Sequence, residues 1–219
     1  MQTFLDKLQQ KIVFNFTDNE TVMDRVKNIM DYVHGLFRHD GDTTPKSLSP
    51  FDIIEAAEKG ISMRCVEYSF LLTALLQAYA IPARIVGLKK KTVETDKEGA
   101  GHVVVEYWDK DYQKWIMCDP QENIIPVVDQ IPLSCYELGL QISKFSDKRY
   151  ANWIKDYLYY YDTAINPNFF ITNDERLVER KMMLIPHGDS GPKIFQQRFP
   201  INAEYVTSVQ EFYEKPLGN

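Results

Sequence analysis

The sequence predicts an α+β fold in which helices precede an antiparallel β-sheet. Apolar residues at helical spacing mark one helix over 22–37 and another over about 65–79. Two β-rich runs, 102–108 and 114–119, flank a turn-like sequence and together predict a hairpin. With 219 residues, of which 44% are hydrophobic, the chain can bury the core of one compact domain.

Capping signals support the predicted helices. Thr17 and Glu20 have the spacing of a capping box ahead of the first helix. Ser49 is followed by Pro50, as at a helix start, and Gly60 is placed to end that second helix. The elements expected in the first part of the chain are helices over 22–37, 49–60 and 62–79 and strands over 81–86, 102–108 and 114–119.

Residues 132–219 are expected to form a β-rich extension packed on a core of residues 1–131, the two making one structural unit. Helical patterns and short apolar runs alternate along this part of the chain. We expect helices over 133–143 and 149–156 and strands over 157–161, 181–186 and 193–196.

A charged segment, 88–101, separates two of the predicted strands. We favour a solvated connection for it, since charged runs usually face water. The alternative is a mobile lid, with Gly99 and Gly101 as its hinges.

His102 and Asp119 lie at the two ends of the predicted hairpin. If Trp108 pairs with Gln113 across the turn, His102 falls directly opposite Asp119. Directly opposed residues share a face of the sheet, with Cβ atoms roughly 4.5–5.5 Å apart. The carboxylate can then hold the imidazole in one tautomer, whereas a one-residue bulge would place the two side chains on opposite faces.

Cys65 is predicted to lie in the first turn of its helix, with Ser62 as the N-cap. Unpaired backbone N–H groups and the positive end of the helix dipole favour a thiolate there, and Arg64 adds positive charge. The helix start should therefore lower the pKa of the Cys65 thiol and offer a donor to an oxyanion. Together with His102 and Asp119, this thiol has the composition of an activated nucleophile with an oriented base.

Five motifs stand in order between residues 60 and 121: RCVEY at 64–68, IPAR at 81–84, GHVVVE at 101–106, Trp115, and DPQ at 119–121. This stretch resembles the core of the transglutaminase-like superfamily. The resemblance implies a papain-like fold, in which a helix bearing the cysteine packs on an antiparallel sheet bearing the histidine and aspartate. It also implies a small, bacterial-type single-domain member with Cys65, His102 and Asp119 as its catalytic triad.

Such a triad predicts acyl transfer at an amide bond. The Cys65 thiolate would attack the carbonyl, His102 would protonate the leaving amine, and Asp119 would orient His102. Water resolves the thioester in a protease, amidase or deamidase, whereas a lysine amine does so in a cross-linking enzyme. By analogy, a small chain fits hydrolysis better than cross-linking. The alternative from another class is a catalytically idle binding or scaffold module.

Arg64, Trp115 and Gln121 are further candidates for binding the substrate or an oxyanion. For Trp115 and Gln121, packing and turn formation are competing structural interpretations. Cys118 and Cys135 are expected to be small buried residues, and strand alternation directs Cys118 away from the face of Asp119.

We expect no cofactor and no metal ion. A zinc site built from the triad would need a fourth ligand or water, and the sequence has no CxxC pairs of the kind found in structural zinc sites. The remaining histidines, His34, His39 and His187, have no placement comparable to that of His102.

Net charge and sequence patterns bound the partners. A net charge of −6 and a pI near 5.3 argue against nucleic acid or an anionic membrane as the main partner. Three cysteines are too few for a disulfide scaffold. No signal peptide and no run of about 18 apolar residues is visible. We therefore expect a soluble, cytoplasmic protein, although an export signal that had been trimmed would leave the same sequence. The partner expected from the triad is a peptide or protein amide substrate.

Overall fold

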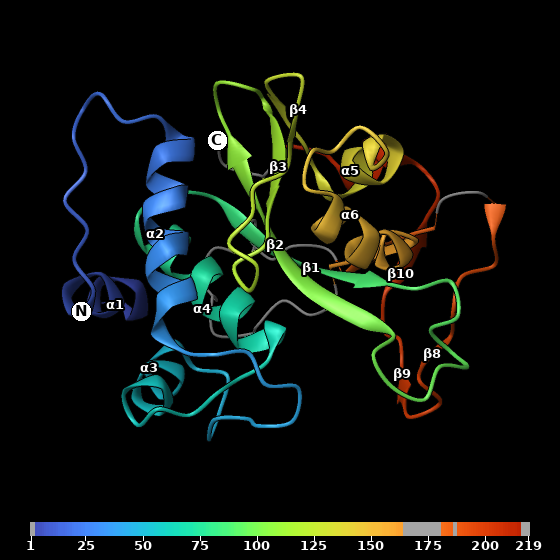
Figure 1. Ribbon diagram of the computed structural model, residues 1–219, viewed down its shortest axis with the longest axis horizontal. Helices are drawn as coiled ribbons and strands as arrows, with labels where there is room; N and C mark the ends of the chain where they lie inside the picture. The colour runs from blue at the N-terminus through green and yellow to red at the C-terminus, as the bar shows by residue number, and fades with distance from the viewer. Residues whose placement is uncertain (1–2, 164–180, 186–187, 216–219) are drawn as a thin grey trace.

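The computed structural model describes residues 3–163, 181–185 and 188–215, and it confirms the α+β class (Figure 1). The helices are α1 (Phe4–Lys11), α2 (Val22–Leu36), α3 (Pro50–Glu58), α4 (Cys65–Ala78), α5 (Cys135–Gln141), α6 (Lys148–Ile154), the 3₁₀ turn η1 (Lys155–Tyr157) and α7 (Val209–Phe212). The strands are β1 (Ala83–Lys89), β2 (Gly101–Asp109), β3 (Lys114–Cys118), β4 (Val127–Val128), β5 (Ile131–Pro132), β6 (Tyr160–Asp162), β7 (Met182–Leu184), β8 (Ile194–Phe195), β9 (Phe199–Pro200) and β10 (Glu204–Val206).

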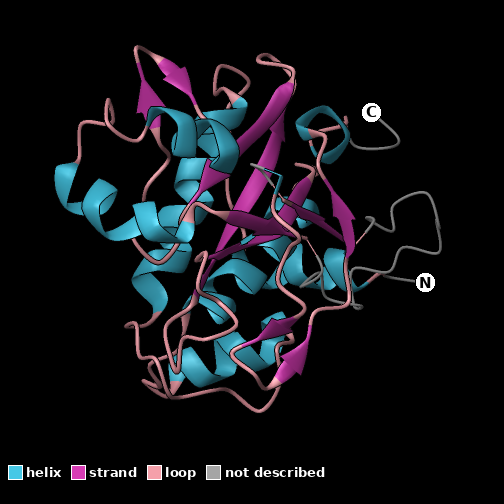
Figure 2. Ribbon diagram, turned by 90° about the vertical axis from the view of Figure 1, so that its right-hand side faces the viewer, coloured by secondary structure: helices cyan, strands magenta, loops and turns pink. Residues whose placement is uncertain are grey.

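A six-stranded sheet with the order β10-β7-β6-β1-β2-β3 lies at the centre of the molecule. Its neighbouring strands are antiparallel except for the parallel pair β10–β7. Helices α1 to α4 lie on one side and α5 and α6 on the other, and the strands run between them (Figures 1 and 2). Because both faces are covered, β1 and β2 are buried along almost their whole length and read as nearly continuous apolar runs.

Helix α4 is the central helix of the first layer. Every residue from Glu67 to Leu76 is buried, because α1 to α3 pack on one side of α4 and β1 and β2 pack on the other. A helix that is apolar on all sides belongs in a protein interior. The first residue of α4, Cys65, is therefore fixed by the core while it remains partly exposed at the helix end.

The N-cap of α2 differs from the predicted one. The capping box is formed by Thr21 and Asp24, whose side chains bond to each other's backbone N–H groups at 3.1 Å. Thr17 and Glu20 instead close a turn before the helix, with the Glu20 N–H bonded to the Thr17 carbonyl at 3.2 Å. The helix starts at the capping box that stands next to its apolar pattern.

The N-cap of α4 also differs from the predicted one. Arg64 occupies the cap position, so Ser62 lies outside the helix. The Glu67 carboxylate accepts the Arg64 backbone N–H at 2.9 Å, so a side chain in the first turn bonds back to the cap residue. The predicted location of Cys65 in the first turn is confirmed.

The β2–β3 hairpin has a register two residues away from the predicted one. Trp108 pairs with Trp115, and Asp109 pairs with Lys114 to close the loop. Gln113 belongs to that loop and has a φ of 51°, in the left-handed region. A shift of two residues preserves which face each side chain occupies, because strands alternate with a period of two.

Segment 88–101 is anchored and not wholly solvated, which corrects the preferred expectation. Val93 and Ala100 are completely buried, in a small cluster with Tyr160 and Met183. The backbone N–H of Gln196 donates to the Val93 carbonyl at 3.0 Å, which attaches the segment to the β8–β9 hairpin. Whether the segment moves as a lid stays a hypothesis.

The extension continues the sheet of the core. Strand β6 pairs with β1, and β7 and β10 follow it outward. Helix α5 lies within its predicted range, and α6 begins one residue before the predicted start at 149. The strand expected over 157–161 begins only at Tyr160, because η1 extends α6 as far as Tyr157. Pro186, the last residue of one predicted strand, and His187 lie outside the described residues. None of the described helices has the length and apolarity needed to cross a membrane.

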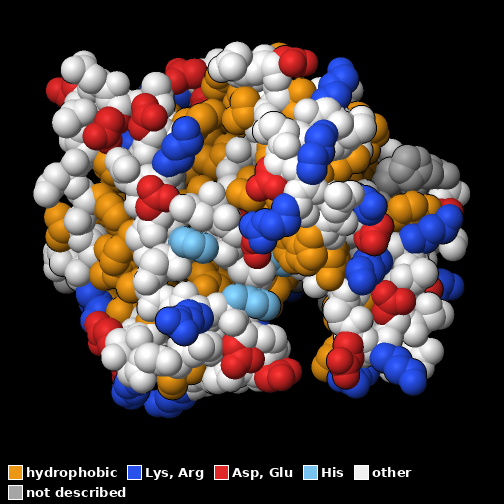
Figure 3. Space-filling view, viewed as in Figure 1, with side chains coloured by type: hydrophobic (Ala, Val, Ile, Leu, Met, Phe, Trp, Pro, Cys, Tyr) orange, Lys and Arg blue, Asp and Glu red, His pale blue; other side chains and the backbone are white. Residues whose placement is uncertain are grey.

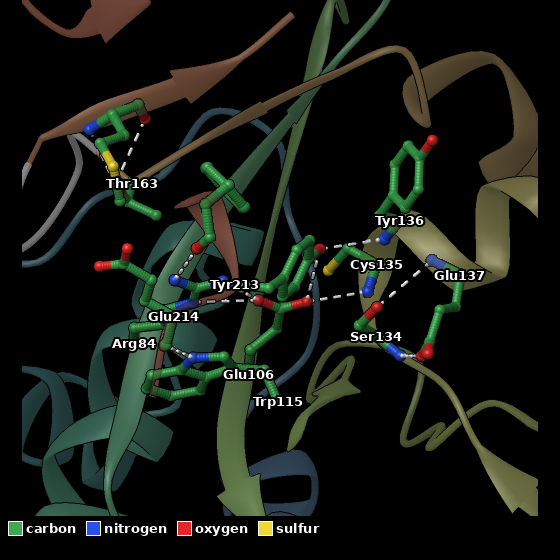
Figure 4. Close-up of polar contacts among 12 residues, drawn as sticks. Arg84, Glu106, Trp115, Ser134, Cys135, Tyr136, Glu137, Thr163, Tyr213 and Glu214 are labelled. Atoms are coloured by element: carbon green, nitrogen blue, oxygen red, sulfur yellow. Dashed lines mark hydrogen bonds and ion pairs between the residues drawn. The ribbon is translucent and has the colours of Figure 1, made fainter. Parts of the chain in front are cut away.

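A buried ion pair joins the extension to the sheet (Figure 4). Glu106 on β2 accepts hydrogen bonds from Arg84 on β1 at 2.8 and 3.0 Å, and neither side chain is more than 3% exposed. The other carboxylate oxygen accepts the Cys135 backbone N–H at 2.8 Å and the Tyr213 hydroxyl at 3.1 Å. Glu106 therefore holds the start of α5 and the residue after α7 against β2, a structural role.

Candidate active site

Cys65 opens α4, where the backbone N–H groups of the first turn have no partner within the helix. One turn further along, the Ser69 hydroxyl donates to the Val103 carbonyl at 2.9 Å in the buried interior. Residues four apart share a helix face. Because Val103 directly follows His102 in β2, this hydrogen bond sets the start of α4 beside His102.

His102 links the other two members of the predicted triad. Its Nε2 lies 2.7 Å from Asp119 Oδ2. Cys65 lies close enough to His102 to be among the groups that raise the pKa of the imidazole. Since Nε2 faces the carboxylate, Nδ1 is the ring nitrogen left for the thiol. The structure thus brings Cys65, His102 and Asp119 together, although by a strand register that differs from the predicted one.

The charges of His102 and Asp119 stabilise each other. Burial disfavours the imidazolium, but the Asp119 charge and hydrogen bond, together with Cys65, raise the pKa of His102 to about 10. Burial likewise opposes ionisation of Asp119, and His102, Tyr150 and the Glu122 N–H overcome it and lower the pKa of the carboxyl group. A protonated His102 beside an ionised Asp119 is the arrangement that stabilises a neighbouring thiolate.

The Asp119 carboxylate is fully buried and is held from every side. Oδ2 accepts hydrogen bonds from His102 and from the Tyr150 hydroxyl, at 2.7 and 2.8 Å. Oδ1 accepts the backbone N–H groups of Gln121 and Glu122, at 3.1 and 3.3 Å. Burial and the charge of Asp119 raise the pKa of Tyr150 well above its usual value, so the phenol stays protonated and remains a donor.

Aromatic residues of α6 and η1 surround the histidine, and sequence reasoning missed them. Trp153 contacts the His102 ring edge to face at 4.8 Å between centroids, and Tyr157 lies 6.2 Å away. Tyr150, Trp153 and Tyr157 have the spacing of one helical face, i, i+3 and i+7. That aromatic stripe was the available signal, but nothing local in the sequence connects it to His102.

Arg64 and Gln121, two further candidates for binding the substrate or an oxyanion, lie in different environments. The Arg64 guanidinium turns back onto the buried Glu67 carboxylate, at 2.6 and 3.2 Å, so its charge is already paired. Gln121 lies next to the triad, with its Nε2 donating to Glu122 at 3.0 Å.

Trp115 does not belong to the site, contrary to its candidacy. It lies at the opposite end of the β2–β3 pair, where its indole N–H donates to the Glu214 carbonyl at 2.9 Å and Arg84 stacks on its ring at 4.4 Å. Cys118 and Cys135 are buried as predicted, and they lie in the cores on opposite faces of the sheet.

An open cavity of about 830 Å³ lies next to the triad. Its walls come from the end of α2 and the loop that follows, from the segment just before Cys65, and from the loop just after Asp119. Figure 3 shows histidine side chains on the surface of this face and a deep indentation between the helical side and the side that carries β8 and β9. Among the described residues, no group of three or more His, Cys, Asp or Glu is placed to bind a metal ion.

Comparisons with known proteins agree with this geometry at the level of the family. The sequence model of the transglutaminase-like superfamily matches residues 6–120, a stretch that contains Cys65, His102 and Asp119. No curated protein matches the chain.

Solved structures similar to the chain are distant. One is a candidate cysteine protease from Cytophaga hutchinsonii, with 22% identity over 57% of this chain and 40% of that one, and a TM-score of 0.43. The periplasmic domain of TgpA from Pseudomonas aeruginosa has 21% identity over 55% of this chain and 42% of that one, with a TM-score of 0.37. Rad4 with Rad23 bound to a 6-4 photoproduct lesion has 18% identity over 64% and 34%, with a TM-score of 0.38. The chain spans less than half the length of each of these structures.

Proposed function

Because this chain belongs to the transglutaminase-like superfamily, we propose that it is a thiol-dependent acyl-transfer enzyme that acts on an amide bond through Cys65, His102 and Asp119. One observation carries the proposal: His102 hydrogen-bonds to the buried Asp119 carboxylate, and Cys65 at a helix start lies close enough to raise the pKa of the same imidazole. This constellation is the one that nucleophilic thiol catalysis requires.

The proposed reaction has two steps. The Cys65 sulfur attacks the amide carbonyl and forms a tetrahedral oxyanion, which the Cys65 backbone N–H at the helix start stabilises. His102 gives its proton to the leaving nitrogen, the C–N bond breaks, and a thioester remains on Cys65. Water, activated as neutral His102 takes up its proton, then cleaves the thioester and releases the acid.

We propose hydrolysis as the outcome, with a peptide or protein amide as the substrate. The acceptor decides this point, because a primary amine in place of water would make the same thioester a cross-linking intermediate. Asp119 keeps His102 oriented and charged through the first step and is not itself protonated.

Profiling with a library of peptide and glutamine amides, with and without an added primary amine, tests the proposal. Wild type should release acid, and Cys65→Ala should reduce turnover by a factor on the order of 10⁴ or more. Cys118→Ala is the matched control, because that thiol is buried in the core away from Asp119 and should leave turnover in place. Turnover that survives Cys65→Ala would contradict the mechanism. If the wild-type Cys65 thiol reacts with no member of the library, the catalytically idle scaffold is favoured.

A further inference from the structure

The cavity beside the triad has an arginine and two histidines in its wall, although the whole chain is acidic. The protein carries a net charge of −6, yet Arg38, His34 and His39 all line this cavity. The acid in the same wall, Glu122, is engaged by the Gln121 amide at 3.0 Å and by Arg149 at 3.4 Å. An arginine in the wall of a cavity beside a nucleophile favours a negatively charged ligand.

Hydrogen bonds fix the position of the wall that carries Arg38 relative to Cys65. The loop after α2 pairs with the segment before the nucleophile, where Met63 exchanges backbone hydrogen bonds with Arg38 and Asp40 at 3.0 and 2.7 Å. The Tyr68 hydroxyl, one turn into α4, donates to the Phe37 carbonyl at 2.6 Å. Cys65 lies two residues after Met63. Arg38 therefore belongs to a segment that pairs directly with the residues leading into the nucleophile.

Another part of the cavity wall is tied to Asp119. His34 bonds through Nδ1 to the Pro120 carbonyl at 3.2 Å, and Gln121 donates its backbone N–H to Asp119. The Gln121 side chain is 8% exposed, and its Oε1 is buried without a hydrogen-bond partner among the described residues. Because Nε2 is committed to Glu122, Oε1 is left as an acceptor, and an unpaired buried acceptor is unfavourable until a donor reaches it.

Building on the proposed function, we propose that this cavity binds a peptide substrate with a carboxylate close to the scissile amide. Arg38 pairs with the carboxylate, beside the His34 and His39 imidazoles that line the same cavity. A backbone N–H of the peptide supplies the donor for Gln121 Oε1. The substrate class is thus an acidic peptide, with Glu or Asp or a terminal carboxylate within a few residues of the bond that Cys65 attacks.

Two measurements on pairs of peptides, identical except for Glu or Gln at one scanned position, test the proposal. In the first, kcat/KM for the acidic peptide should exceed that for its neutral partner by roughly tenfold at one position, the size expected for a charge-assisted hydrogen bond. Arg38→Gln should abolish this ratio, whereas Lys46→Gln, an equal change of charge on an exposed residue that does not line the cavity, should preserve it. Gln121→Leu should weaken both peptides of a pair equally.

The second measurement separates this proposal from the proposed function, because it needs no catalysis. Fluorescence polarisation with the Cys65→Ala protein should show the same tenfold preference for the labelled acidic peptide, and Arg38→Gln in that background should remove it. Equal binding of acidic and neutral peptides, or a preference that persists without Arg38, would overturn the cavity assignment even if the enzyme proves to be a hydrolase. Selective binding with no turnover would contradict the proposed function alone.

Discussion

The Tyr150 hydroxyl donates to Asp119 Oδ2 at 2.8 Å, and the same oxygen accepts the hydrogen bond from His102 at 2.7 Å. Tyr150 lies on α6, outside the stretch that matches the superfamily. The extension therefore reaches the triad itself, because one of the donors to the fully buried Asp119 carboxylate comes from α6.

Removing this hydroxyl should move the acid limb of the activity profile. Tyr150 is among the groups that lower the pKa of Asp119. In Tyr150→Phe the carboxylate loses a donor, its pKa rises, and activity should fall at a higher pH than in wild type. The pH dependence of kcat/KM measures the shift.

Tyr161→Phe is the matched control for Tyr150→Phe. Tyr161 is equally buried in the same core, but its hydroxyl bonds to the Leu158 carbonyl at 3.0 Å and not to the triad. It should leave the acid limb in place. If both variants shift the profile alike, or neither does, Tyr150 only fills the core.

The stability of the protein should depend on the His102–Asp119 pair in a defined pH window. The folded pKa of His102, about 10, lies above the unfolded value of roughly 6.5. The stabilisation is therefore fully present below about pH 6.5 and is lost as pH rises through about 10. On the acid side, the pKa of Asp119 is lower in the folded protein than in the unfolded chain. The stabilisation from Asp119 is therefore present above its unfolded pKa and is lost as pH falls through its folded pKa.

Urea unfolding at several pH values checks this dependence. Asp119→Asn should flatten the decline in unfolding free energy between pH 6.5 and 10. Asp109→Asn is a suitable comparison, because Asp109 is a buried acid that accepts hydrogen bonds from the Asp111 and Tyr112 N–H groups and has no histidine partner. Parallel curves for wild type and Asp119→Asn would show that His102 is not held as an imidazolium.

The Arg84–Glu106 pair should be a large determinant of stability. Glu106→Gln leaves a buried guanidinium without its counter-charge, and breaking a buried pair in this way costs about 3–5 kcal/mol. Thermal or urea unfolding would detect the loss. Lys59→Gln, which breaks an exposed pair with Glu55, should change stability very little, and a similar loss in both variants would argue against the role assigned to Glu106.

Cysteine labelling should be confined to one of the three thiols. Burial raises the pKa values of Cys118 and Cys135 well above the ordinary range, and both are shielded from reagent. Iodoacetamide at neutral pH, followed by peptide mapping, should therefore modify Cys65 in the folded protein. Labelling of Cys118 or Cys135 at a comparable rate would mean that the cores around them open readily.

Periodic patterns predicted the fold better than they predicted exact pairings. The apolar spacing of α2 and α4 located both helices, since that spacing reflects the faces they bury. The observed hairpin register differs from the predicted one by two residues, because the loop sequence does not determine whether the last pair is Trp108 with Gln113 or Asp109 with Lys114. The shared face of His102 and Asp119 survived this error because side chains alternate with a period of two.

Contacts between distant parts of the chain could not be predicted in this way. Tyr150 and Asp119 are separated by 31 residues, and only the packing of α6 on the sheet brings them together. The same holds for Arg84 and the α7 residues around it, since the Arg84–Phe212 hydrogen bond spans 128 residues. Tertiary packing, and not local propensity, selects such partners.

The proposed mechanism requires Cys65 to carry the acyl group. For any amide that the library shows to be turned over, acid quenching in the first turnover, followed by intact mass and peptide mapping, tests it most directly. We expect a thioester adduct whose added mass equals that of the acyl part of the substrate, located on Cys65 and absent from Cys65→Ala. Turnover without a covalent adduct, or an adduct on another residue, would contradict it.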